Sequence, residues 1–214
     1  MKLLSSVHLS EQQKSAITTY ELLGGVLSFF LYQENTKLSV FENHRVAALQ
    51  GLTQVCSFYD FGISEELLLG KKVDFVDFVG SFYDLKEKKL IVKGKSDSFL
   101  NDYFWFDEKE ESKDTELRVR DFFQSSKSDG LSMSEAFIDP PYGLGGSRLE
   151  IGNSFNAIVS SLFDEFSMPD NIYEWSNNCS EYFESGKEWW GTSFYTYFVK
   201  NKSCIVVVLA SATD

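Results

Sequence analysis

The chain has 214 residues, of which 43% are hydrophobic, 24% charged and 16% aromatic. This composition is typical of a globular protein with a substantial core, and it excludes a disordered tail, a collagen-like rod and a small disulfide scaffold. Lysine and arginine number 20 and aspartate and glutamate 32, so the net charge is −12. So acidic a surface repels phosphate backbones and anionic lipid headgroups; nucleic acid and membranes are excluded as expected partners, and basic proteins are favoured.

The cysteines and the N-terminal residues bear on the compartment. Cys56, Cys179 and Cys204 are odd in number and widely spaced, which does not fit a disulfide framework and suits a reducing compartment. The apolar stretch at residues 1–7 is too short for the core of a signal peptide, and no run of about 18 apolar residues could span a bilayer. We therefore expect a cytoplasmic protein.

Helical patterns dominate the first 60 residues. Ser10 and Gln13 match a capping box, and apolar residues then recur at helical spacing over residues 16–31, interrupted by Gly24-Gly25. A second helix is expected to begin after Asn43 and to end near Phe61-Gly62. One face of this helix is expected to be apolar and to consist of Val46, Leu49, Leu52 and Cys56.

The central part of the chain is rich in residues that favour strands. Residues 73–79 and 90–93 flank a charged stretch and predict a β-hairpin. Residues 99–106 and 117–120 predict two further strands, separated by a charged loop at 107–116.

The last third gives the clearest pattern. Residues 139–146 must be irregular because of their proline and glycine content, and residues 155–166 predict an amphipathic helix capped by Asn153. A short strand is expected at 172–175, and residues 192–209 predict a β-hairpin whose second arm is buried on both faces. Residues 1–214 are therefore predicted to form a single α+β domain, with an antiparallel sheet, flanking helices and a C-terminal β-hairpin.

One short motif suggests chemistry. Asp139-Pro140-Pro141-Tyr142 resembles the D-P-P-Y motif of amino-methyltransferases that use S-adenosylmethionine. The resemblance implies that the acid and a proline carbonyl accept hydrogen bonds from a target amine, while the tyrosine stacks on a flipped base. Such enzymes also need a glycine loop after a strand, and Gly143–Arg148 has arginine in place of the third glycine. A rigid turn is the simpler interpretation, and a methyltransferase is kept as the alternative function.

Other catalytic patterns in the sequence are incomplete. There is no G-x-S-x-G elbow, no C-x-x-C pair and no H-E-x-x-H motif. The histidines are His8 and His44, and His44 is interpreted as a surface or capping residue near a helix start, not as a general base. No metal ligand set and no cofactor is predicted.

The segment from Glu150 to Trp190 combines acidic and large aromatic residues, and Lys187 is its only basic side chain. Aromatic anchors supply energy at protein interfaces, and surrounding carboxylates steer a basic partner. We therefore interpret it as a partner-binding surface; the competing interpretation is that the rings face a core. The candidate partner-binding residues are Asp164, Glu165, Asp170, Glu174, Trp175, Glu181, Tyr182, Glu184, Glu188 and Trp189.

Several stretches of the last third carry a resemblance to a known class of proteins. They are Tyr173–Ser176, Glu188–Gly191, Phe194–Thr196, Ile205–Val208 and Ala210–Asp214. Together they resemble the C-terminal end of some small bacterial immunity proteins, the cytoplasmic antidotes encoded beside secreted or contact-delivered toxins. The resemblance implies a non-enzymatic protein that occludes a basic toxin sterically and electrostatically, and it carries over no specific functional residue. Self-association through the aromatic surface is a third interpretation, and the oligomeric state is left open.

Overall fold

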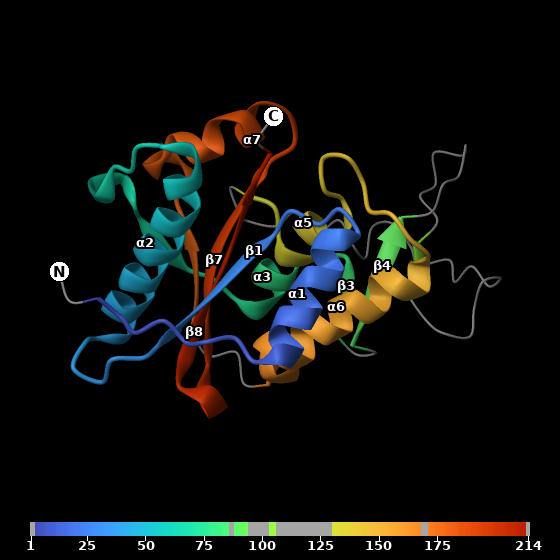
Figure 1. The fold of residues 1–214 in the computed structure, drawn as a ribbon, viewed down its shortest axis with the longest axis horizontal. Helices are drawn as coiled ribbons and strands as arrows, with labels where there is room; N and C mark the ends of the chain where they lie inside the picture. The colour runs from blue at the N-terminus through green and yellow to red at the C-terminus, as the bar shows by residue number, and fades with distance from the viewer. Residues whose placement is uncertain (1–2, 86–87, 94–102, 106–129, 168–170, 213–214) are drawn as a thin grey trace.

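A five-stranded antiparallel sheet organises the part of the chain that the computed structural model describes, residues 3–85, 88–93, 103–105, 130–167 and 171–212 (Figure 1). Its strands, in spatial order, are β1 (Ser28–Gln33), β8 (Cys204–Ser211), β7 (Thr192–Val199), β6 (Ile172–Trp175) and β2 (Gly70–Lys72). A smaller sheet consists of β3 (Tyr83–Asp84), β4 (Lys89–Lys93) and β5 (Tyr103–Trp105), also paired antiparallel. The α+β class predicted from the sequence is confirmed.

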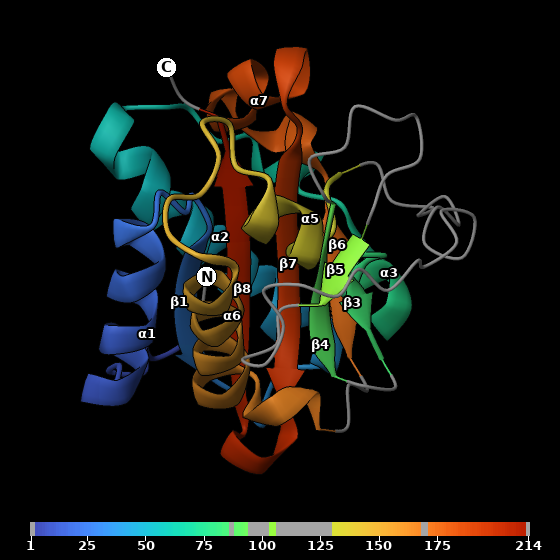
Figure 2. The same cartoon turned by 90° about the vertical axis from the view of Figure 1, so that its right-hand side faces the viewer.

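Helices cover both faces of the large sheet. The α-helices are α1 (Glu11–Leu22), α2 (Val40–Tyr59), α3 (Phe75–Val79), α5 (Met133–Ile138), α6 (Arg148–Leu162) and α7 (Glu184–Trp189). Short 3₁₀ turns lie at η1 (Glu65–Leu67), η2 (Asp164–Phe166), η3 (Asn177–Cys179), η4 (Glu181–Phe183) and η5 (Lys200–Lys202). Helix α2 lies on one face of the sheet, and α1, α3, α5 and α6 lie on the other (Figures 1 and 2).

The predicted C-terminal hairpin is confirmed, and it lies inside the sheet between β1 and β6. Strands β7 and β8 pair over their full length, from Thr192 opposite Ser211 to Val199 opposite Cys204. Every residue of β8 is buried. Because side chains alternate along a strand, β8 contributes to two separate cores. Val206, Val208 and Ala210 join one core, and Ile205, Val207 and Leu209 join the other.

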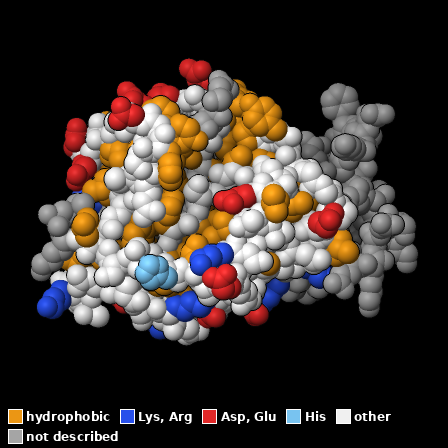
Figure 3. Space-filling view, viewed as in Figure 1, with side chains coloured by type: hydrophobic (Ala, Val, Ile, Leu, Met, Phe, Trp, Pro, Cys, Tyr) orange, Lys and Arg blue, Asp and Glu red, His pale blue; other side chains and the backbone are white. Residues whose placement is uncertain are grey.

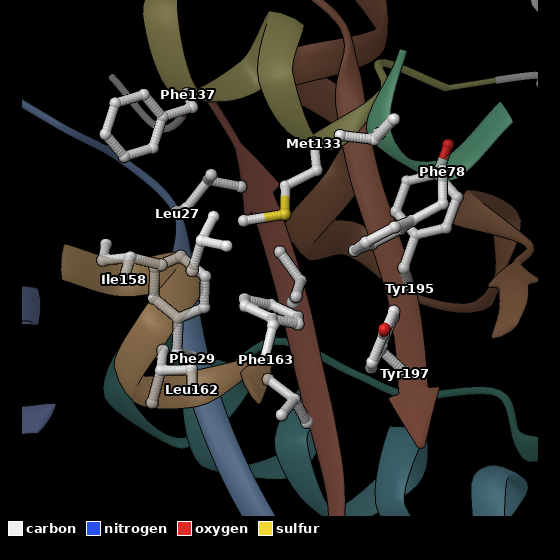
Figure 4. Packing of buried hydrophobic residues seen from close by; sticks show 14 of the residues in the cluster. Leu27, Phe29, Phe78, Met133, Phe137, Ile158, Leu162, Phe163, Tyr195 and Tyr197 are labelled. Atoms are coloured by element: carbon white, nitrogen blue, oxygen red, sulfur yellow. The ribbon is translucent and has the colours of Figure 1, made fainter. Parts of the chain in front are cut away.

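The larger core lies between the sheet and α1, α3, α5 and α6, and aromatic rings fill much of it (Figure 4). Phe78 of α3 packs edge-on against Tyr195 of β7, with ring centroids 5.4 Å apart. Tyr20 of α1 stacks on Phe137 of α5 at 4.2 Å. Burying a side chain of this size contributes roughly 1.5–3 kcal/mol, so these contacts fix the helices against the sheet.

The long first helix expected from the sequence is wrong after Leu22. The chain turns at Gly24, which has φ +97°, and residues 28–33 form strand β1. A Cβ at Gly25 would lie 2.2 Å from the Tyr20 ring, so this position admits only glycine while the ring stays in place. The helical spacing of Leu27 and Leu31 equally fits a strand buried on alternating positions.

The predicted hairpin in the central region is correct only in its second half. Residues 75–79 form helix α3, not a strand, and the hairpin is made by the short β3 with β4. Strand β5 falls inside the predicted strand 99–106. The expected strand 117–120 and the loop 107–116 lie outside the described residues.

Four helices begin with the same serine cap. Ser10, Ser39, Ser132 and Ser147 each accept a hydrogen bond from the backbone N–H three residues on, and the Glu or Gln there bonds back. The predicted cap at Ser10 is confirmed. The cap at Asn153 and the helix start after Asn43 are corrected, because the capping boxes at Ser147 and Ser39 begin those helices earlier.

Replacing the cap of α6 tests this account of helix boundaries. Ser147→Ala leaves the first-turn N–H groups without their side-chain acceptor, so it should lower the free energy of unfolding by about 1 kcal/mol. Ser160→Ala, at an exposed position near the end of the same helix, serves as the control and should change stability by less than about 0.5 kcal/mol. Urea denaturation of the three proteins measures both effects. Equal stability of the Ser147→Ala variant and the parent would contradict the assignment.

Candidate functional site

One end of the large sheet gathers segments that are far apart in sequence. Helix α2 and strand β8 both end there, and η4 and α7 lie across it (Figure 1). The loop 139–147 reaches the same end, because Trp190 Nε1 donates to the Asp139 carbonyl at 2.6 Å and Gly145 N–H donates to the Leu23 carbonyl at 2.7 Å. We call this region the α7 end.

Glycine at position 186 allows the close contacts of α7 with the residues around it. A Cβ at Gly186 would lie 2.4 Å from the Gly191 carbonyl oxygen and 2.5 Å from Ser211 Oγ. Glycine therefore lets α7 approach the end of β8 closely. The helix then presents Trp189 at its end, with the side chain half-exposed.

Four of the predicted binding residues lie together at the α7 end. Glu181, Glu184 and Glu188 are exposed on η4 and α7, next to Trp189. Glu181 Oε2 accepts a hydrogen bond from Gly62 N–H at 3.4 Å, and Glu184 forms an ion pair with Lys187 at 2.7 Å. These four side chains are therefore accessible, and their role in binding a partner stays a prediction.

Three other predicted residues are inside the protein. Trp175 is 3% exposed, Tyr182 5% and Glu174 9%, so in this conformation they do not form a free docking surface. Burial raises the pKa of the Tyr182 hydroxyl above its usual value. Trp175 and Tyr182 are therefore core residues, as the competing interpretation of the segment expects.

The remaining predicted residues are at the other end of the sheet or outside the described residues. Asp164 Oδ2 accepts hydrogen bonds from Ser167 Oγ and Asn201 Nδ2, and Glu165 is exposed beside it. The Ser167 and Asn201 bonds lower the pKa of Asp164. Strand β7 separates this turn from α7 by about 25 Å, at 3.3 Å per residue. Asp170 lies outside the described residues.

His44 is buried, which corrects the expectation of a surface or capping residue. It is 1% exposed, and its Nδ1 lies 2.8 Å from Thr196 Oγ1, which also accepts a hydrogen bond from Trp175 Nε1 at 2.9 Å. Its Nε2 is buried without a hydrogen-bond partner among the described residues. Burial, with the nearby Lys72 charge, lowers the pKa of His44 to about 3, so the ring is neutral at physiological pH.

The predicted partner-binding residues do not include three exposed aromatic residues at the α7 end. Phe58 is 80% exposed and Tyr59 53%, both in the last turn of α2, and Tyr142 of the loop 139–147 is 83% exposed. The Tyr142 ring lies 6.2 Å from the ring of Trp189. Large apolar side chains that gather on a surface are typical of interaction sites. Phe58 and Tyr59 are large aromatic residues at the end of the predicted second helix. Phe58 lies on the side of that helix away from its predicted apolar face, and this position is the sequence signal for an exposed ring.

A groove runs between these aromatic residues. It has a volume of about 310 Å³ and is bordered by the end of α2, the loop 139–147 and the ends of β1 and β8. Its aromatic lining consists of Phe30, Phe58, Tyr59, Tyr142 and Tyr182. We call it the aromatic groove.

Two carboxylates are chain neighbours of residues that line the groove, Asp60 beside Tyr59 and Glu181 beside Tyr182. Asp60 follows Tyr59 directly as the left-handed cap of α2, and the glutamates of η4 and α7 carry the same charge. We call Asp60, Glu181, Glu184 and Glu188 the acidic rim; all four are exposed. In Figure 3 acidic side chains lie along the upper edge beside hydrophobic ones, and acidic and basic side chains are mixed in the lower half. Lys200 and Lys202 of η5 belong to the end opposite α7.

The Asp139–Tyr142 motif forms a turn between two helices. Residues 139–147 connect α5 to α6 without regular structure, as expected, and Gly143 N–H donates to the Pro140 carbonyl at 2.8 Å. The strand pairings of the two described sheets are all antiparallel, and the glycines after Tyr142 follow no strand. The methyltransferase alternative therefore gains no support from the fold and remains a prediction from the motif.

The cysteines are not placed as nucleophiles. Cys56, Cys179 and Cys204 are free and buried, and burial raises the pKa of Cys179 and of Cys204 to about 11. The described residues contain no group of three or more His, Cys, Asp or Glu side chains arranged to hold a metal ion. Within the same residues, every helix lacks either the length or the apolar character that crossing a bilayer requires.

Comparison of the chain with models of known protein families, with curated proteins and with solved structures gives no match. Any functional assignment therefore rests on the residues and geometry of the α7 end.

Acid should destabilise the protein through His44. Because its pKa is about 3 when folded and about 6.5 when exposed, the unfolded chain binds the extra proton between these values. The stability that the protein has with His44 neutral in both states is complete above about pH 6.5. As the pH falls below that value, the free energy of unfolding decreases by up to about 1.4 kcal/mol per pH unit. Urea unfolding near pH 7 and near pH 5 should show a clearly smaller pH effect for His44→Gln than for the parent. The exposed His8→Gln variant is the control, and equal pH effects in all three proteins would contradict the prediction.

Proposed function

We propose that the chain is a protein-binding module whose α7 end docks a basic protein. The observation that carries the proposal is the convergence of four exposed aromatic side chains, Phe58, Tyr59, Tyr142 and Trp189, from α2, the loop 139–147 and α7. Aromatic residues are enriched among those that dominate binding energy, and the acidic rim beside them favours a positively charged partner.

The most concrete form of this proposal is an immunity protein of the bacterial cytoplasm that neutralises a basic toxin. The net charge of −12 and the resemblance of the C-terminal stretches to such proteins support it. Binding at the α7 end would cover the toxin's active site and exclude its substrate. The rim carboxylates would accelerate encounter and the aromatic residues would slow dissociation.

Charge reversal at the rim tests the proposed function. In Glu181→Lys/Glu188→Lys the net charge changes from −12 to −8, because each substitution adds two charges. Affinity for the basic protein encoded by the neighbouring gene should fall at least about tenfold, and its toxicity on co-expression should return. Titration calorimetry at low and high salt measures the affinity, and growth of the co-expressing cells measures neutralisation.

The matched control places the same change at the opposite end. Glu34→Lys/Glu165→Lys also brings the net charge to −8 but leaves the α7 end unaltered. It should retain binding and neutralisation. If both double variants lose affinity equally, net charge alone explains binding; if the parent forms no salt-sensitive complex, the proposed function is wrong.

A further inference from the structure

We infer that the aromatic groove binds an arginine side chain of the partner, in preference to lysine. This inference rests on the proposed function, and it specifies which part of a basic protein enters the α7 end. It gives Tyr142, the last residue of the Asp139–Tyr142 turn, the role of stacking on a guanidinium group. This role does not depend on the chain being a methyltransferase.

The chemistry of the groove matches a guanidinium group. Tyr59 and Tyr142 belong to its lining. Tyr142 is largely exposed, and Tyr59 is half-exposed with one ring face stacked on Phe61 at 5.4 Å, so part of each ring surface is available to a ligand. A guanidinium plane stacks on such rings while its five N–H groups point outward in a fixed fork. The ammonium group of lysine has no plane to stack and holds its hydration shell more strongly.

Two carboxylates near the lining residues can accept from those N–H groups. The Asp60 carboxylate follows Tyr59 directly, and the Glu181 carboxylate lies within reach of Gly62, two residues further on. Paired N–H groups of arginine bind a carboxylate through two parallel hydrogen bonds. Ser211 also lines the groove, but its hydroxyl is buried beside Gly186 of α7, so the ring faces and the nearby carboxylates are the groups offered to a ligand.

The size and form of the groove agree with a single inserted side chain. A volume of about 310 Å³ is at the lower end of the range for ligand pockets. Its walls come from separate elements that are fixed by the two cores, so the site exists before a partner arrives. An exposed arginine on a basic protein therefore finds a preformed position, which reduces the entropy cost of binding.

Blocked pentapeptides test the inference with the full-length protein. One peptide carries two arginines separated by glycine, and the other carries lysines at the same positions. In ¹⁵N NMR titrations the arginine peptide should shift the Trp189 indole signal and the backbone signals of residues 58–60 and 142. It should bind about threefold or more tightly than the lysine peptide. Equal affinities, or shifts spread over distant acidic residues, would overturn the inference.

Three variants check that stacking causes the preference. Tyr142→Ala should abolish the difference between the peptides, and Tyr142→Phe should retain it because the ring is kept. Val76→Ala, at an exposed apolar position on α3, should behave like the parent. If Tyr142→Phe loses the preference as Tyr142→Ala does, stacking is not the cause and the inference fails.

The two proposals fail in different ways. A basic partner that binds in a salt-sensitive, rim-dependent manner while the peptides show no arginine preference would overturn this inference and leave the proposed function standing. Arginine preference without any neutralised or bound basic protein would support the groove's chemistry and overturn the function proposed for it.

Discussion

Complete burial of strand β8 is the constraint on which the rest of the structure depends. A strand that is apolar on both faces must be covered twice, and the chain does this with α2 on one side and α1, α3, α5 and α6 on the other. These helices meet the sheet over its middle and leave its two ends to short turns and loops. The α7 end is one of these two ends. The elements that carry its aromatic side chains are anchored in the cores, while the side chains themselves lie outside them.

Much of the fold could be predicted because its centre has an unambiguous pattern. Residues 172–175 and the hairpin 192–209 combine β-branched and aromatic residues with clear turns, and the structure keeps those bounds almost unchanged. The prediction of one helix over residues 16–31 is wrong because a helix and a buried strand both place apolar residues at the positions of Leu27 and Leu31. The local turn at Gly24 and the Tyr20 ring over Gly25 end the helix, and the pairing of residues 28–33 with β8, which is distant in sequence, makes them a strand. Ser39 and Ser147 each have a glutamate three residues on and so match the capping-box pattern in the sequence, whereas apolar spacing alone puts both helix starts too late.

The candidate site was only partly predictable, since sequence does not state which aromatic residues are buried. Trp175 and Trp189 stand in similar acidic surroundings, yet Trp175 packs on the core and bonds Thr196 while Trp189 is half-exposed. The acidic residues of η4 and α7 are exposed on neighbouring elements, but Asp164 and Glu165 lie at the opposite end of β7. Phe58, Tyr59 and Tyr142 come from outside the segment 150–190, and only the folded chain brings them to Trp189.

The central claim is that the exposed rings at the α7 end form the contact surface for a basic protein. Fluorine NMR of the 5-fluorotryptophan-labelled protein, with a paramagnetic reagent in solution, tests it most directly, the signals being assigned by Trp→Phe variants. In the free protein the reagent should broaden the Trp189 signal and leave Trp175 sharp. Saturation with the basic partner should protect Trp189. A complex that forms while Trp189 stays as accessible as in the free chain would contradict the account.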